Sequence, residues 1–256
     1  MSSVFEYNFE DFMKGLDDVS VSNIIGGSIT GGFTGEPYQR YMFVGLINDT
    51  SRSMWGKKLE ILNASNTEIV NILKEKEANL ETAGLRIAVM EFNSTAHWMH
   101  KEAIDIREYD YTPIENATGG TNYGDAYTIL SKHLSPDHML KDAHDYAPVL
   151  LFVTDGMPSY PYETQLEKLK KNPWFSHAIR VAVMINDDHC VRNPKECREA
   201  LKAFTGSDEM VKEVRDLSEL KDMIVTMTVN SVLLQSRAGS QQESEDDAFD
   251  PLNPLF

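Results

Sequence analysis

The chain has 256 residues and a mass of 28.9 kDa, which is enough for a full hydrophobic core, and a single α/β domain with a tail accounts for this length. Its 40 Asp and Glu residues outnumber its 24 Lys and Arg residues, and the formal net charge of −16 repels nucleic-acid phosphates and anionic lipid headgroups. We therefore expect neither nucleic acid nor a membrane as a partner.

Residues 1–37 are predicted to be an N-terminal extension with a Gly-rich segment, Gly26 to Gly35. A phosphate-binding loop is the alternative interpretation of that segment, but it lacks a Gly-Lys-Ser/Thr ending and a preceding strand. The stretch Met1 to Asp18 carries acidic residues where a signal peptide has basic and then apolar ones, and no apolar run has the length of a membrane span. These features predict a cytoplasmic protein.

Residues 38–235 alternate short apolar runs with segments of helical periodicity. Four nearly continuous apolar runs are typical of strands buried on both faces: Tyr41 to Ile47, Leu85 to Phe92, Val149 to Val153 and Ala178 to Ile185. Helices are predicted over Leu59 to Leu73, Tyr127 to Leu134, Tyr162 to Lys171, Pro194 to Phe204 and Leu217 to Leu234. This order indicates an α/β fold with a doubly wound, mostly parallel, Rossmann-like sheet and helices on both faces.

One hairpin interrupts the parallel pattern. The run that ends at Phe92 is followed by Asn93-Ser94 and then by a second extended stretch, Thr95 to Tyr109. A short polar turn between two such runs is typical of antiparallel pairing. We therefore expect one antiparallel edge strand.

Oxygen-bearing side chains stand directly after two of the predicted strands. Asp49-Thr50-Ser51-Arg52-Ser53 follows the first run, Thr154-Asp155-Gly156 follows the third, and Gly119-Gly120-Thr121 precedes a predicted helix. The carboxyl ends of parallel strands meet at one edge of a sheet. Mg²⁺ prefers oxygen ligands and keeps several waters, so a few hydroxyls and one or two carboxylates suffice. The alternative is that these residues only cap helices and end strands.

In their order, these three segments resemble the metal-ion-dependent adhesion site (MIDAS) of the von Willebrand factor type A (VWA) family, over about residues 38 to 235. The resemblance implies that Mg²⁺, or alternatively Mn²⁺ or Ca²⁺, is held by five residues: Asp49, Ser51, Ser53, Thr121 and Asp155. It also implies that a Glu or Asp of a partner protein completes the metal shell. Arg52 stands where the family often has Gly; it is either a solvated cation or a partner-binding group that pairs with that carboxylate.

The chain is most similar to stand-alone bacterial VWA proteins of tellurite resistance and stress response, which accompany kinase and phosphatase partners. This finer resemblance rests on Gly119 to Asp125 and on Asp216 to Val229. A Mg²⁺-dependent phosphohydrolase is the alternative, but the sequence has no nucleophile elbow, no His-Glu-x-x-His and no Walker loop. We therefore predict a non-enzymatic binding module in which Asp49→Ala or Thr121→Ala abolishes capture and leaves the fold intact.

Two further regions allow more than one interpretation. His189, Cys190 and Cys197 are consistent with reduced thiols or, without an evident fourth ligand, with zinc. Residues 236–256 form an acidic tail that is too polar to order itself. The tail is interpreted as solvating chain, as a docking peptide through Phe249 to Leu252, or as an internal ligand that places Glu245 or Asp247 on the metal.

Overall fold

The computed structural model describes residues 40–77, 83–140, 145–187 and 193–248; for residue 83 and residues 234–248 it describes the backbone alone. Among the described residues, seven strands form one sheet in the order β3-β2-β1-β5-β6-β7, with β4 also paired to β2. The strands are β1 (Arg40–Asp49), β2 (Ala83–Phe92), β3 (Ala96–Trp98), β4 (Ile104–Asp105), β5 (Tyr146–Thr154), β6 (Ile179–Ile185) and β7 (Val211–Val214). The predicted α/β sheet is confirmed, with the four apolar runs as its central strands.

Strand directions also agree with the prediction. β1 pairs in parallel with β2 and β5, and β5, β6 and β7 continue the parallel order. β3 and β4 both pair antiparallel with β2, so the predicted edge consists of two very short strands. The sequence did not predict β7, because four residues with two half-buried members carry almost no periodic signal.

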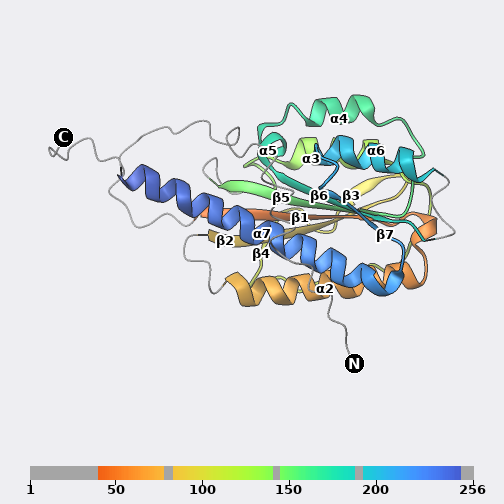
Figure 1. The fold of residues 1–256 in the computed structure, drawn as a ribbon, viewed down its shortest axis with the longest axis horizontal. Coiled ribbons are helices and arrows are strands. Elements are labelled where there is room, and N and C mark those ends of the chain that lie inside the picture. Colours follow the sequence, from red (N-terminus) through yellow and green to blue (C-terminus); the bar gives the residue numbers. More distant parts are fainter. Residues whose placement is uncertain (1–39, 78–82, 141–144, 188–192, 249–256) are drawn as a thin grey trace.

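Helices cover both faces of the sheet (Figure 1). They are α2 (Lys57–Glu77), α3 (Tyr123–His133), α4 (Glu163–Leu169), α5 (Pro173–His177), α6 (Pro194–Thr205) and α7 (Leu217–Ala248), with a short 3-10 helix, η2 (Arg52–Met54), after β1. Leu59 and Leu62 of α2 share a buried cluster with Leu220 of α7 on one face, whereas Leu130 of α3 and Phe204 of α6 belong to the cluster on the other. No helix in the described part of the chain combines the length and apolarity that a bilayer crossing requires.

Side-chain caps fix where helices begin. The Asn122 side chain accepts a hydrogen bond from Asp125 N at the start of α3, and Asn193 does the same for Glu196 N at the start of α6. Gly206 ends α6 in the left-handed conformation. Helix α6 agrees closely with its predicted range, whereas α3 begins four residues before the periodic stretch because Asn122 caps it there.

Helix α7 is longer than its apolar pattern indicated. Periodicity predicted a helix over Leu217 to Leu234, but the helical backbone continues to Ala248, through much of the segment expected to be too polar to order itself. Extending an existing helix fixes one residue for each new hydrogen bond, so it avoids the cost of nucleation. The segment Phe249 to Phe256 lies outside the described residues.

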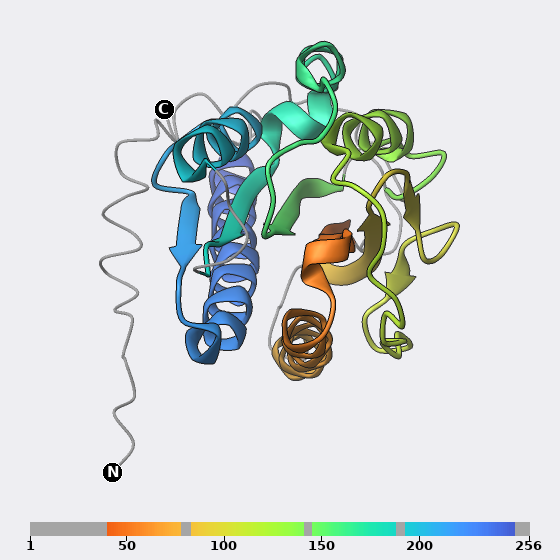
Figure 2. The ribbon, with the colours of Figure 1, turned by 90° about the vertical axis from the view of Figure 1, so that its right-hand side faces the viewer.

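The parallel strands all end at one edge, which faces the viewer in Figure 2, where η2 and the loops after β1 and β5 lie. Asn48 of β1 is paired with Val153 of β5, and each strand ends one residue later. This register brings Asp49 and Asp155 together, although they are far apart in the sequence.

Candidate metal centre

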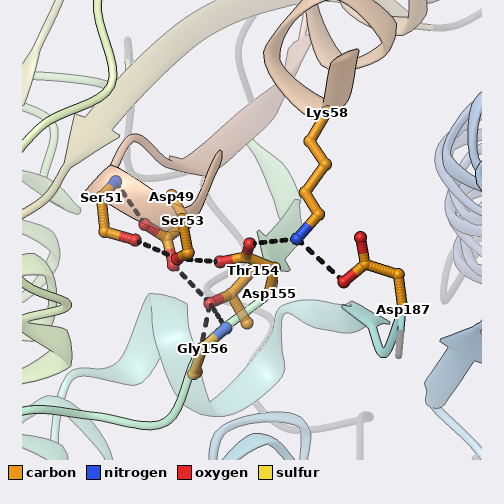
Figure 3. Close-up of polar contacts among 8 residues, drawn as sticks. All are labelled: Asp49, Ser51, Ser53, Lys58, Thr154, Asp155, Gly156 and Asp187. Carbon is orange, nitrogen blue, oxygen red and sulfur yellow. Dashed lines mark hydrogen bonds and ion pairs between the residues drawn. The ribbon is translucent and has the colours of Figure 1, made fainter. Parts of the chain in front are cut away.

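The loop after β1 places three of the predicted ligands around one another (Figure 3). The backbone N–H of Ser51 donates to Asp49 Oδ1 at 2.7 Å, which holds the loop in a tight turn. The hydroxyl oxygens of Ser51 and Ser53 lie 3.2 Å apart, and Ser53 Oγ donates to Asp155 Oδ1 at 2.6 Å. Four of the five predicted residues therefore converge through direct contacts.

Thr121 approaches the same group from a third loop. Gly119 has φ 79°, and Gly120 N donates to Ser94 Oγ at 3.0 Å, so the chain turns sharply before Thr121. A Cβ added at Gly156 would lie 3.1 Å from Thr121 Oγ1 and 3.9 Å from Asp49 Oδ2. The Thr121 hydroxyl and the Asp49 carboxylate thus border the same space beside Gly156, and all five predicted residues meet.

Most of this group is buried, although the expectation that Asp49→Ala or Thr121→Ala leaves the fold intact requires these residues to lie outside the core. Asp49 and Asp155 are 0% exposed, Ser51 is 2% exposed and Thr121 is 5% exposed, whereas Ser53 is exposed. Replacing Asp49 by alanine would leave buried donors of the loop and strand without an acceptor. We therefore expect Asp49→Ala to disturb the fold as well as the site, and Ser53 is the cleaner position for a substitution.

Burial raises the pKa of the Asp49 carboxyl from 3.8 to about 7, and the nearby charge of Asp155 adds to the rise. Hydrogen bonds from Thr154 Oγ1, at 2.5 Å from Asp49 Oδ2, and from Ser51 oppose it. Two carboxylates in a water-poor site repel each other unless a cation lies between them. The electrostatics of the pair therefore favour a positive ion.

Sequence reasoning missed Lys58 and Asp187, and it placed Thr154 beside the site without assigning it a role. The Lys58 ammonium lies 2.7 Å from Asp155 Oδ2 and 2.9 Å from Asp187 Oδ1 (Figure 3). Asp187 follows β6 at the same edge of the sheet, so the strand-end argument used for Asp49 would have found it. The sequence could not single out Lys58, because adjacent Lys57 has the same charge. Only the orientation of the helix in the fold decides which of the two is buried.

The donor set fits a hard divalent cation. Each carboxylate oxygen has two lone pairs. The hydrogen bonds from Ser51 N and Thr154 Oγ1 occupy one on each oxygen of Asp49, which leaves acceptor capacity on both. Hydroxyls of Ser51, Ser53 and Thr121 supply neutral oxygens, as Mg²⁺ sites that retain waters require. Within the described residues no group of three or more His, Cys, Asp or Glu side chains is placed to hold a metal, so a site here depends on hydroxyls and water.

The zinc interpretation gains no support in the described part of the chain. His189 and Cys190 lie outside the described residues. Cys197 is buried on α6, its thiol donates to the Gly156 carbonyl oxygen at 3.4 Å, and burial raises its pKa to about 12. A neutral thiol with that bond is a structural group and a poor zinc ligand.

Arg52 lies on the surface beside the site. Its side chain is exposed, and its backbone N–H donates to the Gly119 carbonyl oxygen at 3.2 Å, which ties the first loop to the third. Partner binding by its guanidinium stays a prediction.

Comparison with solved structures identifies the architecture. The vWF domain of the type V pili tip protein Mfa5 from Porphyromonas gingivalis matches with a TM-score of 0.53 and 10% identity, covering 77% of this chain and 96% of that one. The von Willebrand factor type A protein from Catenulispora acidiphila matches with a TM-score of 0.50 and 19% identity, covering 75% and 43%. The chain has the VWA fold. Its sequence matches no model of a known family and no curated protein.

A further solved structure with the VWA fold contains a bound metal. Proximal thread matrix protein 1 from the mussel byssus, in a structure with a zinc-occupied MIDAS motif, matches with a TM-score of 0.57 and 14% identity. The match covers 77% of this chain and 49% of that one, so this chain spans about half the length of the mussel protein. At this identity the likeness establishes the VWA fold alone.

Proposed function

We propose that this protein is a non-enzymatic binding module that uses a divalent cation, Mg²⁺, to capture an acidic side chain of a partner protein. The observation that carries the proposal is the convergence of Asp49, Ser51, Ser53, Thr121 and Asp155 at the strand-end edge of a VWA fold. Ser53 is exposed while the carboxylates beneath it are buried, so the site opens outward through hydroxyls.

Each residue has a distinct part in this proposal. Asp49 and Asp155 supply the negative charge that attracts the cation, and their burial makes that charge costly without one. Ser51, Ser53 and Thr121 supply neutral oxygens, so the site keeps a low charge. When bound, the cation supplies a Lewis-acid position that an incoming carboxylate can occupy. Thr121 lies next to the N-terminus of α3, whose N–H groups favour an approaching anion.

The finer assignment belongs to the same proposal. We infer a cytoplasmic stress-response or signalling protein of the tellurite-resistance type, with partners that include a kinase or phosphatase. Its support is the sequence resemblance over Gly119 to Asp125 and Asp216 to Val229, together with a net charge of −16 that disfavours nucleic acid and anionic membranes.

Calorimetry with Mg²⁺ on the full chain tests the metal, with Ser53→Ala and Thr121→Ala as variants. We expect each variant to bind Mg²⁺ about tenfold or more weakly, because each removes one oxygen and leaves the two buried carboxylates in place. Ser176→Ala is the matched control, since Ser176 is an exposed hydroxyl on α5, away from the strand-end edge. Wild-type Mg²⁺ affinity in Ser53→Ala and Thr121→Ala would contradict the proposed ligand set.

Affinity purification in Mg²⁺ and in chelator then tests capture, with identification of the retained proteins. Proteins retained by wild type in Mg²⁺ should be lost in chelator and lost with Thr121→Ala. The phosphohydrolase alternative is tested by turnover of p-nitrophenyl phosphate with and without Mg²⁺. A Mg²⁺-dependent rate that Thr121→Ala removes would favour the enzyme, whereas the binding module predicts none.

A further inference from the structure

Two aromatic side chains stand out on the surface of the described residues. Trp55 is 61% exposed and Tyr160 is 45% exposed, and they are the large hydrophobic side chains found exposed in this part of the chain. An exposed aromatic ring gains free energy when a ligand covers it, and exposed apolar residues that lie together can mark a binding site. Their common location is therefore informative.

Both residues belong to segments next to the candidate metal centre. Trp55 follows Ser53 by two residues, and its backbone N–H donates to the Arg52 carbonyl oxygen at 3.3 Å. The Tyr160 ring lies against Gly120, since a Cβ added there would be 3.4 Å from a ring carbon. Ser159, next to Tyr160, donates its backbone N–H to the Thr121 carbonyl oxygen at 2.7 Å. Trp55 thus lies at the end of the segment that carries Ser53, and Tyr160 belongs to the segment that is hydrogen-bonded to Thr121.

Arg52 adds a positive charge to the same face. Its side chain is exposed, and among the described residues it forms no ion pair. A face with a metal centre, a guanidinium group and two aromatic rings suits a chain segment in which acidic and aromatic residues are interspersed. We call Arg52, Trp55, Tyr160 and the five candidate ligands the metal face.

The sequence of this chain contains such a segment near its N-terminus. Residues 5–12 read Phe-Glu-Tyr-Asn-Phe-Glu-Asp-Phe, with carboxylates at Glu6, Glu10 and Asp11 between aromatic residues. The segment lies outside the described residues, so its position is not part of the structure. Its chemistry is complementary to both the charge and the aromatic rings of the metal face.

The connection is long enough for residues 5–12 to reach the metal face. The described chain begins with β1 at Arg40, and β1 then runs about 30 Å to Asp49 at the metal face. Roughly 27 residues separate Phe12 from Arg40, and a chain of that length spans at most about 90–97 Å, which is more than the distance along β1. A tether that can span the distance raises the effective concentration of the attached segment at the site.

The acidic C-terminus does not have this reach. α7 starts three residues after β7 at the metal-face edge and runs along the sheet away from it for 32 residues, about 48 Å (Figure 1). Glu245 and Asp247 lie in its last turn, at the far end. The interpretation in which one of them occupies the metal of the same molecule is therefore wrong.

We propose that residues 5–12 dock on the metal face of their own chain, with one of Glu6, Glu10 or Asp11 at the metal position. The aromatic residues of the segment pack on Trp55 and Tyr160. The inference rests on the proposed metal-dependent function and adds to it an internal ligand, which an external acidic partner must displace. Partner affinity is thereby weakened by the ratio of the effective concentration to the intrinsic dissociation constant.

The test uses the full chain and a labelled synthetic peptide of residues 3–14 added in trans, followed by fluorescence anisotropy in Mg²⁺. The variant Glu6→Gln/Glu10→Gln/Asp11→Asn removes the internal carboxylates. The matched control Asp17→Asn/Asp18→Asn/Glu36→Gln removes the same charge from the same extension outside the segment. We expect the peptide to bind the first variant about tenfold more tightly than wild type and the control as wild type.

A second measurement reports docking within one molecule. Trp98 is buried and Trp174 is half-buried, so acrylamide quenching of tryptophan fluorescence mainly reports Trp55. Mg²⁺ should protect Trp55 in wild type and in the charge control, and chelator or the Glu6/Glu10/Asp11 variant should remove the protection. Trp55→Phe confirms the source of the signal.

Equal peptide affinity in wild type and the Glu6/Glu10/Asp11 variant, or equal quenching, would overturn the docking proposal. Absence of peptide binding to that variant in Mg²⁺ would overturn it as well. The proposed function is judged separately by Mg²⁺ calorimetry with Ser53→Ala, so a chain that binds Mg²⁺ through Ser53 but shows no effect of residues 5–12 retains the function and loses the internal ligand.

Discussion

The ammonium group of Lys58 lies 2.7 Å from Asp155 Oδ2, on the carboxylate whose other oxygen accepts the hydrogen bond of Ser53. The lysine side chain is only 6% exposed and reaches Asp187 as well. A tethered cation thus shares a carboxylate with the candidate metal centre. Lys58 stabilises the buried negative charge of Asp155 in the metal-free protein. For the same reason it competes with a bound metal ion for that carboxylate.

Lys58→Met should therefore strengthen Mg²⁺ binding while it destabilises the metal-free protein. Removing one partner of a buried ion pair costs roughly 3 kcal/mol, and Mg²⁺ should restore much of this stability because it compensates Asp155. Thermal unfolding in chelator and in Mg²⁺, together with calorimetry, measures both effects. The exposed neighbour Lys57→Met is the control and should change neither. Unchanged or weaker Mg²⁺ binding by Lys58→Met would show that Lys58 supports the metal and does not compete with it.

The raised pKa of Asp49 predicts a pH dependence with a definite sign. The metal-free folded protein holds a proton on Asp49 up to about pH 7, whereas the unfolded chain releases it near 3.8. The folded state binds more protons over that interval, so this carboxyl lowers the stability as pH rises from about 4 to 7, by up to about 4 kcal/mol. Urea unfolding in chelator should show this loss as a pH-dependent difference in the free energy of unfolding between wild type and Asp49→Asn. The contributions of the other titrating groups cancel in that difference. A constant difference between the two proteins across the interval would contradict the shifted pKa.

Thr154 should affect Mg²⁺ binding through its hydrogen bond to Asp49. Its hydroxyl donates to Asp49 Oδ2 at 2.5 Å and stabilises the ionised form. Thr154→Val keeps the shape but removes that donor, so we expect Mg²⁺ to bind several-fold more weakly at pH 7, with a smaller deficit at pH 9. Thr50→Val is the matched control, because Thr50 is equally buried and donates to the Phe92 carbonyl oxygen. A deficit that stays the same at both pH values would point to a distorted loop.

Alanine substitutions at two glycines distinguish the cost of backbone strain from the cost of steric contact. Gly119 and Gly56 have similar positive φ angles, 79° and 84°, but a Cβ at Gly119 would meet Ser94 Oγ at 2.7 Å and a Cβ at Gly56 would meet nothing within 4 Å. Gly56→Ala should cost about 1 kcal/mol from conformation alone. Gly119→Ala should cost more and also weaken Mg²⁺ binding, because the displaced loop carries Thr121. Chemical denaturation and calorimetry measure the two effects, and equal behaviour of both variants would exclude a role for the Ser94 contact.

The sequence by itself determined where the four central strands lie along the chain and which five residues are candidate ligands. Apolar runs that end in Asp49 and Asp155 are local features, and the rule that parallel strands end at one edge turns them into neighbours. The pattern of α6 is local as well, so its boundaries could be predicted from Pro194 onward, whereas the Asn122 cap sets the start of α3 before its periodic residues begin. Whether the five residues hold a metal stays a prediction until it is measured.

Only the tertiary structure decided the surroundings of those ligands. Which of Lys57 and Lys58 enters the site depends on the rotation of α2 against the sheet, and the full burial of Asp49 depends on neighbouring loops from distant parts of the chain. The extent and direction of α7 decided that its acidic end lies far from the metal face. Periodicity and spacing describe one element at a time, whereas burial, charge pairing and reach depend on how the elements pack together in space.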